Sequence, residues 1–291
     1  MEKIAQYFAI EGTVTGVRPL GNGLINDTYL VSSSVGKRYV LQRINHTIFK
    51  DVDLLQRNIA YVTAHIRAKL IAAGEDDVER KVLRFISLKD SDSTYYTDGE
   101  SYWRMSAFIE GSVTVETVTP ESSYCAGKAF GEFQTMLVDI KEPIGETIPD
   151  FHNMELRARQ LREAVANDPL GRCSEPEIRG FLSEIDLHIE EMCKAERLHR
   201  EGILPKRICH CDTKVSNMLF DMDGSVLCVI DLDTLMPSFI FSDVGDFLRT
   251  AANYVAEDCP EIDKVGFNMD IFRPFIKGYL ESAGSFLTEV E

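Results

Sequence analysis

A cluster of polar residues in the second half of the chain has the residue types and spacing that phosphoryl transfer from ATP requires. Asp212 is followed by Lys214 two positions later and by Asn217 five positions later, and Asp231 follows a predicted hairpin. The reaction needs a carboxylate that orients the acceptor hydroxyl and accepts its proton, an amide and a carboxylate that hold Mg²⁺, and a cation near the γ-phosphate. These four side chains supply the groups that the reaction needs.

The elements around this cluster are predicted to bring its members into one cleft. They are an apolar segment at residues 203–208, a short strand at 218–220, a turn at 221–224 and a buried strand at 226–230. Taken singly, an Asp or Asn in a loop more often stabilises a turn or caps a helix, and Asp231 could simply end a strand. The combination of types, spacing and context favours a phosphotransferase.

The composition is that of an acidic globular chain. Of its 291 residues 44% are hydrophobic, which is enough for a large core, and 31 basic against 47 acidic side chains give a net charge of −16. This charge argues against nucleic acid or an anionic membrane as a partner and tolerates a neutral or cationic substrate. The N-terminus lacks the apolar core of a signal peptide and no apolar run is long enough to span a bilayer, so we expect a cytoplasmic protein.

Seven cysteines in such a chain are expected to be free thiols and not a disulfide framework. Three neighbours, Cys209, His210 and Cys211, resemble a metal site at first sight. In an extended segment the two cysteines would share one face and His210 would take the other, and no CxxC pair supports a zinc site. We interpret His210 instead as a hydrogen-bonding support for the loop that follows it.

Residues 1–110 are predicted to form a small lobe made of a sheet and one helix. Predicted strands cover residues 13–19, 28–32, 38–44, 81–88 and 101–109. A helix capped by Asp51 or Asp53 carries apolar residues three or four positions apart, namely Leu55, Ile59, Val62, Ile66 and Leu70. This order of elements is that of a kinase small lobe, with a hinge near residues 108–111.

Residues 111–291 are predicted to form a larger and mainly helical lobe. Helices are expected from Pro120 onward and at residues 151–166, 175–198, 246–254 and 268–283. The expected fold is therefore α+β, bilobal and like that of a protein kinase. The N-terminal lobe would bind the nucleotide, and the C-terminal lobe would carry the catalytic loop, the metal ligands and the acceptor site.

The loop between the first two predicted strands is a candidate for contact with nucleotide phosphates. It contains Gly21, Gly23, Asn26 and Thr28 and joins two strands, so it is neither a Rossmann nor a Walker loop, both of which open a helix. Glycines let the backbone approach phosphates closely, whereas the simpler alternative is a tight hairpin. We assign all four residues to the nucleotide site.

A kinase also places a basic residue on its third strand to pair with the α- and β-phosphates, and a helix Glu beside it. Arg43 is the best candidate for this role, and the alternative is a solvent-facing charge on the strand. The helix that follows offers Gln56, Arg57 and Asn58 but no Glu before its C-terminal end. The expected contacts to the phosphates therefore depart from the protein-kinase pattern.

Several short segments carry a resemblance to a known family. The segment His210-x-Asp212-x-x-x-x-Asn217, followed by Ile230-Asp231, resembles the aminoglycoside phosphotransferase superfamily of small-molecule kinases. Five segments look similar to one group within it, the N-acetylhexosamine 1-kinases, namely Gly23-x-x-Asn26-Asp27-Thr28, Val40-Leu41-Gln42-Arg43-Ile44-Asn45, Ile148-Pro149-x-Phe151-His152, Asp212-Thr213-Lys214 and Asp243-x-Gly245-Asp246-x-x-Arg249. Those bacterial enzymes phosphorylate the anomeric hydroxyl of N-acetylglucosamine or N-acetylgalactosamine.

The resemblance implies a role for each residue of the cluster. Asp212 would be the catalytic base, Asn217 and Asp231 the ligands of Mg²⁺, and Lys214 the cation beside the phosphoryl group transferred from ATP. A small-molecule sugar or other metabolite would be the acceptor.

Three further residues of these segments have two interpretations each. Asp246 and Arg249 would either support the catalytic loop or the acceptor side, or be no more than an Asp at a helix N-terminus and an ordinary surface Arg. His152 either reaches the sugar or caps a helix, and we favour capping. Family members usually continue through further helices that help to close the sugar pocket, whereas this chain ends at Glu291. Its acceptor site is therefore expected to be incomplete or built differently.

Two other functions compete with a sugar kinase. The same fold and reaction could serve choline, homoserine or an aminoglycoside as the acceptor. A nucleotide-binding pseudokinase would keep the fold without turnover, although none of the catalytic groups is missing. A protein kinase is disfavoured because the chain has no Asp-Phe-Gly triplet and no Ala-Pro-Glu element.

Overall fold

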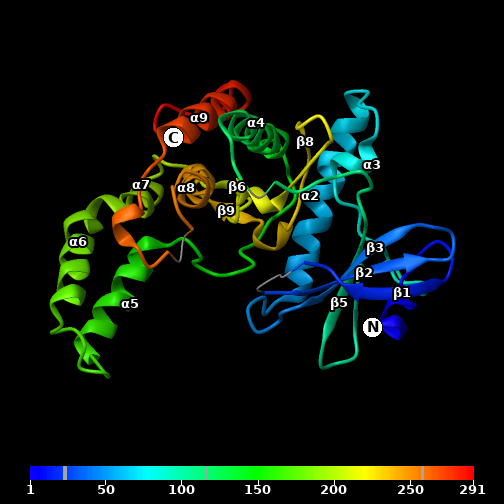
Figure 1. The fold of residues 1–291 in the computed structure, drawn as a ribbon, viewed down its shortest axis with the longest axis horizontal. Coiled ribbons are helices and arrows are strands. Elements are labelled where there is room, and N and C mark those ends of the chain that lie inside the picture. Colours follow the sequence, from blue (N-terminus) through cyan, green and yellow to red (C-terminus); the bar gives the residue numbers. More distant parts are fainter. Residues whose placement is uncertain (22–24, 116, 257–258) are drawn as a thin grey trace.

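The computed structural model describes residues 1–291 apart from 22–24, 116 and 257–258, and it has two lobes. In Figure 1 a five-stranded sheet lies at one end of the molecule, and helices α5 (Met154–Asn167) and α6 (Pro176–Met192) lie at the other. The short strands formed by residues 207–238 lie between these ends. The predicted α+β bilobal fold, with a sheet in one lobe and mainly helices in the other, is confirmed.

The N-terminal lobe is built on an antiparallel sheet with the strand order β1-β2-β3-β5-β4. Its strands are β1 (Val14–Pro19), β2 (Asp27–Ser33), β3 (Arg38–Ile44), β4 (Tyr95–Thr97) and β5 (Tyr102–Ala107). Successive side chains of a strand point to opposite faces. One face buries Tyr39, Leu41, Trp103 and Met105 in an apolar cluster with the short helix α1 (Glu2–Ala5). The other face of β3 and β5 is therefore turned toward the C-terminal lobe.

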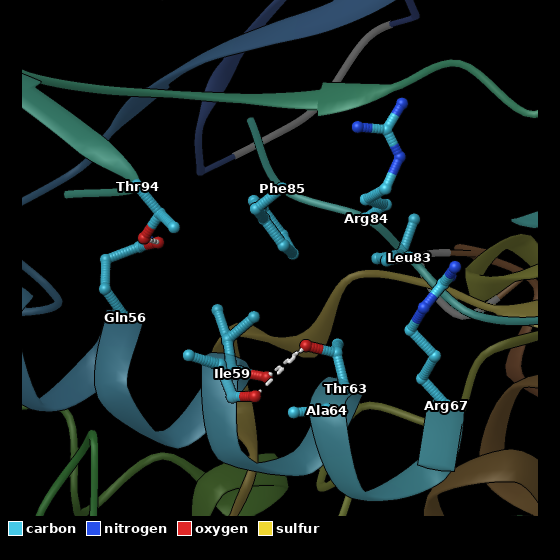
Figure 2. A pocket seen from close by; sticks show the side chains of 10 residues that line it. Gln56, Ile59, Thr63, Ala64, Arg67, Leu83, Arg84, Phe85 and Thr94 are labelled. Carbon is cyan, nitrogen blue, oxygen red and sulfur yellow. Dashed lines mark hydrogen bonds between the residues drawn. The ribbon is translucent and has the colours of Figure 1, made fainter. Parts of the chain in front are cut away.

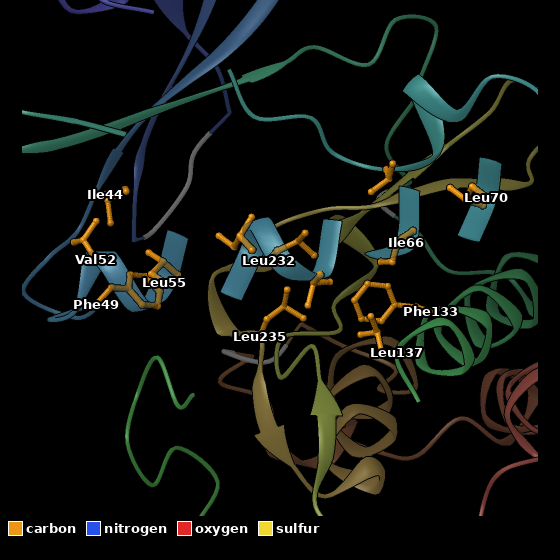
Figure 3. Packing of buried hydrophobic residues seen from close by; sticks show 13 residues of the cluster. Ile44, Phe49, Val52, Leu55, Ile66, Leu70, Phe133, Leu137, Leu232 and Leu235 are labelled. Atoms are coloured by element: carbon orange, nitrogen blue, oxygen red, sulfur yellow. The ribbon is translucent and has the colours of Figure 1, made fainter. Parts of the chain in front are cut away.

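A long helix, α2 (Val52–Ala72), packs between this sheet and the C-terminal lobe. The Asp51 carboxylate accepts a hydrogen bond from Leu54 N, so Asp51 caps the helix as predicted. The predicted apolar stripe from Leu55 to Leu70 is buried. Figure 3 shows that this stripe shares one core with residues of the C-terminal lobe, namely Phe133, Leu137, Leu232 and Leu235. Apolar packing thus holds the two lobes together.

The C-terminal lobe combines helices with two short strand pairs. Its other helices are α4 (Pro120–Leu137), α7 (Lys194–Arg200), α8 (Ile240–Ala251) and α9 (Met269–Ala283), with single 3₁₀ turns η1 (Val215–Asn217), η2 (Leu232–Thr234) and η3 (Ile262–Lys264). Strand β6 (Arg207–Cys209) pairs with β9 (Met236–Ser238), and β7 (Met218–Phe220) pairs with β8 (Val226–Val229). The predicted β7–β8 hairpin is confirmed, whereas β9 was not predicted.

Three predicted elements were wrong in type or extent. Helix α3 (Val78–Lys81) ends where a strand over residues 81–88 was expected to begin, and the rest of that segment forms isolated bridges, Phe85 with Ser106 of β5 and Leu88 with Phe8. Its apolar residues are buried by packing and not by a strand ladder. The helix expected at 175–198 is divided at Cys193 into α6 and α7, and the one expected at 246–254 begins earlier as α8.

Helices α4 and α9 pack so closely that their contact depends on glycine. A Cβ atom added at Gly127 would overlap the carbonyl oxygen of Phe275, and one added at Gly278 would overlap that of Tyr124. The hydroxyl of Ser123 also donates to Ile271 O across this contact, at 2.7 Å. Backbone-to-backbone contact of this kind leaves no room for a methyl group.

We therefore expect Gly127→Ala to destabilise the protein by about 1–3 kcal/mol, although alanine favours helices. Gly180→Ala is the matched control, because Gly180 lies in α6 with no atom within 4 Å of an added Cβ. That change should stabilise by about 1 kcal/mol. Urea unfolding measures both values, and a Gly127→Ala variant as stable as the control would contradict the close packing.

A charged contact joins the two lobes at their surface. Lys69 of α2 donates to Asp139, which follows α4, and also to Met136 O at 2.8 Å. The Lys69 ammonium, helped by His65, lowers the pKa of Asp139 to about 2. An unfolded Asp has a pKa of about 3.9, so the folded state binds the proton more weakly than the unfolded state does.

This contact predicts a pH dependence with a definite sign. The stability that Asp139 contributes is complete above about pH 4 and is lost as the pH falls toward 2. Asp139→Asn should therefore lose less of its free energy of unfolding than the wild type between about pH 5 and pH 3. Lys69→Gln, which removes the main partner, should behave in the same way. A wild-type acid response in both variants would argue against the contact.

Candidate active site

The loop between β6 and β7 holds Asp212 in contact with two other residues of the predicted cluster. Asn217 Nδ2 donates to Asp212 O at 2.8 Å and to Asp212 Oδ2 at 2.9 Å. Lys214 Nζ lies 3.1 Å from Asp212 Oδ1. The amide of Asn217 thus uses its nitrogen to orient the Asp212 carboxylate, and its oxygen points away from that contact.

The backbone of this loop is held by Asp243 of α8, a buried carboxylate for which no role was predicted. Asp243 Oδ2 accepts from His210 N at 2.9 Å and from Gln134 Nε2 at 2.8 Å, and Oδ1 accepts from Cys211 N at 2.8 Å. Burial raises the pKa of Asp243, and the hydrogen bonds oppose that effect. They also hold Cys211 at φ +63°, a left-handed conformation that few non-glycine residues adopt.

His210 connects the loop to the end of β8. Its Nε2 donates to Ile230 O at 2.9 Å, and its Nδ1 accepts from Asp212 N at 3.3 Å. The supporting role predicted for His210 is confirmed by these contacts.

Asp231 follows β8 and faces a cavity between the lobes, as does Asn217. Burial, together with the nearby Asp233 carboxylate, raises the pKa of Asp231 to about 6, while Arg104 acts in the opposite direction. A buried carboxylate whose charged form is disfavoured in this way fits a site that a cation completes. The oxygens of Asn217 and Asp231 are also the hard ligands that Mg²⁺ prefers.

The cavity between the lobes has a volume of about 710 Å³, which lies in the range of small-molecule sites. Its walls are mostly apolar, and its polar groups come from the sheet, from the segment after the hinge and from the two ends of the β7–β8 hairpin. The lining includes Gly21, Thr28, Val40, Gln42, Phe85 and Arg104 from the N-terminal lobe, Phe108 and Ile109 at the hinge, and Asn217 and Asp231 from the C-terminal lobe.

The residues predicted for the nucleotide loop lie in different places. Gly21 and Thr28 line the cavity, and Gly23 lies outside the described residues. Asn26 is buried and does not line the cavity. Its Nδ2 donates to Asp233 Oδ2 at 2.7 Å and its Oδ1 accepts from Asn45 N at 2.9 Å, so it supports the loop from behind.

Arg43 is not brought to the cavity. Its side chain is about half exposed and pairs with Asp27 at 2.5 Å. Since Val40 and Gln42 of β3 line the cavity, the alternation of the strand turns Arg43 to the opposite face. Gln42 therefore holds the inward position nearest to the one at which a basic residue was expected.

Helix α2 presents an amide and not a carboxylate beside the cavity. Figure 2 shows a smaller cavity of about 220 Å³ between α2 and residues 83–94, which shares Leu83 and Phe85 with the larger one. Gln56 lies at its edge, and its Oε1 accepts from Thr94 Oγ1 at 3.1 Å. The helix therefore has Gln56 where a protein kinase would have a Glu, and the Gln56 side chain is hydrogen-bonded to Thr94 in the neighbouring segment.

Asp246 continues the site on the far side of the catalytic loop. Asp246 Oδ2 accepts from Thr213 N at 2.7 Å, and its Oδ1 lies 2.8 Å from Arg249 Nη2. Of the two interpretations of Asp246, support of the catalytic loop is confirmed by this bond. Asp246 and Arg249 also line a second cavity of about 250 Å³.

His152 lies in this second cavity and does not cap a helix, so that expectation was wrong. Asn153 is the cap of α5, because its side chain accepts from Leu156 N at 3.0 Å. Burial lowers the pKa of His152, and its Nδ1 has no hydrogen-bond partner among the described residues. Phe239, Phe241 and Glu196 also line this second cavity.

The two lobes, the cavity between them and the Asp212–Asn217–Asp231 arrangement define a kinase-like phosphotransferase. The chain belongs to the phosphotransferase enzyme family, whose model matches residues 16–273.

Solved structures of low sequence identity share this fold. Amicoumacin kinase in complex with AMP-PNP and Ca²⁺ has a TM-score of 0.58 and 12% identity, over 97% of this chain and 76% of that chain. Spectinomycin phosphotransferase in complex with ADP and spectinomycin has a TM-score of 0.56 and 14% identity, over 96% and 77%. Plasmodium vivax ethanolamine kinase has a TM-score of 0.53 and 17% identity, over 93% and 68%.

None of the helices in the described part of the chain is long and apolar enough to cross a bilayer.

The role of Asp243 can be tested by a change of similar shape. Asp243→Asn replaces an oxygen that accepts from the loop backbone with an NH₂ group that cannot accept, so buried N–H groups lose their partner. We expect a loss of about 2–4 kcal/mol in the free energy of unfolding. Asp270→Asn, at an exposed position in the first turn of α9, should cost less than about 1 kcal/mol. Urea unfolding compares the two, and equal losses would contradict the assigned role.

Proposed function

We propose that this protein is an ATP-dependent kinase that phosphorylates a small-molecule hydroxyl, specifically the anomeric O1 of an N-acetylhexosamine. The observation that carries the proposal is the reach of the catalytic loop. At one end of the loop Asn217 lines the interlobe cavity, and near its start Thr213 binds Asp246, which lines the second cavity. Asp212 directly precedes Thr213 and is hydrogen-bonded to Asn217, so it contacts both ends of this stretch, as transfer from a nucleotide in one cavity to an acceptor in the other would require.

The side chains of the loop would divide the chemistry among themselves. Asp212, oriented by Asn217, would position the acceptor hydroxyl and accept its proton. An anomeric hydroxyl is more acidic than an ordinary alcohol, so a carboxylate is a sufficient base. Lys214 would place positive charge beside the transferred group.

Nucleotide and metal would be held from both lobes. Gly21 and Thr28 would contact the phosphates of ATP from the sheet. Asn217 and Asp231 would hold Mg²⁺, which when bound supplies positive charge to the phosphate oxygens. Asn26 would act indirectly, since it is bonded to Asp233 behind the cavity.

The second cavity suits a sugar acceptor. Phe239 and Phe241 offer aromatic surface for the apolar face of a pyranose ring. Asp246, Arg249 and His152 offer polar groups for its hydroxyl and acetamido substituents. The resemblance of five sequence segments to N-acetylhexosamine 1-kinases supports the same acceptor.

A cationic acceptor is the second candidate. Glu196 and Asp246 lie in the wall of the second cavity, and the net charge of the chain is −16, so an amino alcohol or an aminoglycoside would also be attracted. The solved neighbours include an ethanolamine kinase and a spectinomycin phosphotransferase. Their acceptors differ from one another, so the fold alone does not select among acceptors.

The central test is Asp212→Asn. We expect turnover to fall by about 10²–10⁴-fold, because the base is lost, while the affinity for Mg-ATP stays within about threefold. Asp223→Asn, in the exposed turn of the β7–β8 hairpin, is the matched control and should turn over normally. ADP release measures the rate, and titration calorimetry measures the affinity. Near-normal turnover of Asp212→Asn would rule out its role as the base.

The acceptor is identified by ADP release with N-acetylglucosamine, N-acetylgalactosamine, choline, homoserine and an aminoglycoside. Turnover confined to the N-acetylhexosamines, with phosphorus coupling to the anomeric proton in the NMR spectrum of the product, supports a 1-kinase. Turnover on a cationic acceptor supports the second candidate. Binding of ATP without turnover on any acceptor would favour a nucleotide-binding pseudokinase.

A further inference from the structure

The interlobe cavity has a basic residue, but it lies on a different strand from the one expected. Gln42 of β3 lines the cavity, while Arg43 beside it faces away and pairs with Asp27. Among the described residues that line the cavity, Arg104 of β5 is the one with a positive charge. Its side chain is only 2% exposed, so a purely solvent-facing role is excluded.

Arg104 lies directly beside Gln42 in the sheet. Thr28, Gln42 and Arg104 are paired in register across β2, β3 and β5. Arg104 Nε donates to Gln42 Oε1 at 3.0 Å, and Gln42 Nε2 donates to Thr28 Oγ1 at 3.3 Å. The three side chains form one polar row on the face of the sheet that lines the cavity. The guanidinium is also stacked 5.5 Å from the centre of the Phe85 ring.

Asp233 holds the other side of the guanidinium. Arg104 Nη1 lies 2.5 Å from Asp233 Oδ1, and both side chains are at most 4% exposed. The second oxygen of Asp233 accepts from Asn26 Nδ2 at 2.7 Å. Asp233 is two residues beyond Asp231, so this ion pair ties the sheet directly to the turn that carries the candidate metal ligand.

A buried ion pair is expensive to form, because both charges lose their hydration. Its retention at a cavity is explained when the pair fixes a charge where a ligand needs it. In protein kinases a Lys on the third strand contacts the α- and β-phosphates, and a helix Glu holds that Lys. Here the corresponding strand position is an amide, and the helix presents Gln56, which is bonded to Thr94 (Figure 2).

We propose that Arg104, held by Asp233, is the nucleotide-binding cation of this protein and contacts the phosphates of the bound nucleotide. This pair takes the role that a Lys–Glu pair has in protein kinases, where the cation contacts the phosphates and the anion holds the cation. Here the cation comes from β5 in place of β3, and the anion comes from η2 in place of the helix. The inference rests on the proposed ATP-dependent function and adds to it a residue that phosphate binding depends on.

The test is the affinity of the protein for adenosine, AMP, ADP and ATP, measured by titration calorimetry. Loss of a charge-assisted contact to phosphate corresponds to about a tenfold to a hundredfold weaker affinity. We expect Arg104→Gln to weaken ADP and ATP by this factor and to leave adenosine within about twofold. Arg43→Gln is the matched control on the neighbouring strand and should leave all four affinities unchanged.

Two further variants separate phosphate contact from structural support. Arg104→Gln leaves Asp233 buried without its partner, so Arg104→Gln/Asp233→Asn removes both charges and keeps the shape. It should fold and show the same selective loss. Gln42→Lys/Arg104→Gln moves the cation to the paired position on the adjacent strand and should recover at least tenfold of the ADP affinity.

The outcomes separate this inference from the proposed function. Wild-type protein that binds no adenine nucleotide would remove the proposed function and this inference together. Nucleotide binding that survives in Arg104→Gln/Asp233→Asn would overturn this inference alone. An equal loss for adenosine and ADP would also overturn it, because it would show that Arg104 only shapes the cavity.

Discussion

The carboxylate of Asp243 is 1% exposed, and a charge buried that deeply must find its partners inside the protein. Two of its partners are the backbone N–H groups of His210 and Cys211, so the demand of one side chain fixes the path of the catalytic loop. The third is Gln134 of α4, a helix that packs on α9 through glycines at which an added Cβ would overlap the backbone. The position of Asp212 therefore depends on a contact that reaches through the lobe to its outer helices.

Asp233, at the boundary between the lobes, is also a buried carboxylate whose partners lie inside the protein. Its donors, Asn26 and Arg104, both come from the N-terminal lobe, although Asp233 itself follows the candidate metal ligand in the C-terminal lobe. Burial raises the pKa of Asp231, and repulsion from the nearby Asp233 carboxylate raises it further. A cation on either side relieves this repulsion. The ion pair between the lobes and the candidate metal site therefore share charges, because Arg104 and a bound cation would both offset the Asp231 and Asp233 carboxylates.

Local sequence predicted the catalytic loop because its chemistry sits on a few neighbouring residues. Asp212, Lys214 and Asn217 lie within six positions, and the structure joins them by direct contacts. Residues that act through distant partners could not be found in this way. Asp243 and Asp233 can be recognised as supports of the site only once the groups that donate to them are known. The face to which Arg43 points depends on the residue at which the strand alternation begins, and the sequence does not determine that residue. The strand expected at residues 81–88 failed for a related reason, since buried apolar residues mark packing as readily as they mark a ladder.

The register of β3 and β5 explains how a phosphate-binding cation could change strand without changing place. Gln42 and Arg104 are paired residues whose side chains leave the sheet on the same face and meet at 3.0 Å, so a positive charge at either position reaches the same region of the cavity. What such a site requires is one cation with a fixed anionic partner, and Asp233 is within reach of this row. The basic residue on the third strand is Arg43, whose side chain points to the face of the sheet opposite the cavity. The cavity requires a cation at this place but does not require that a particular strand supply it. The position that a sequence motif indicates therefore differs here from the position that lies in the cavity.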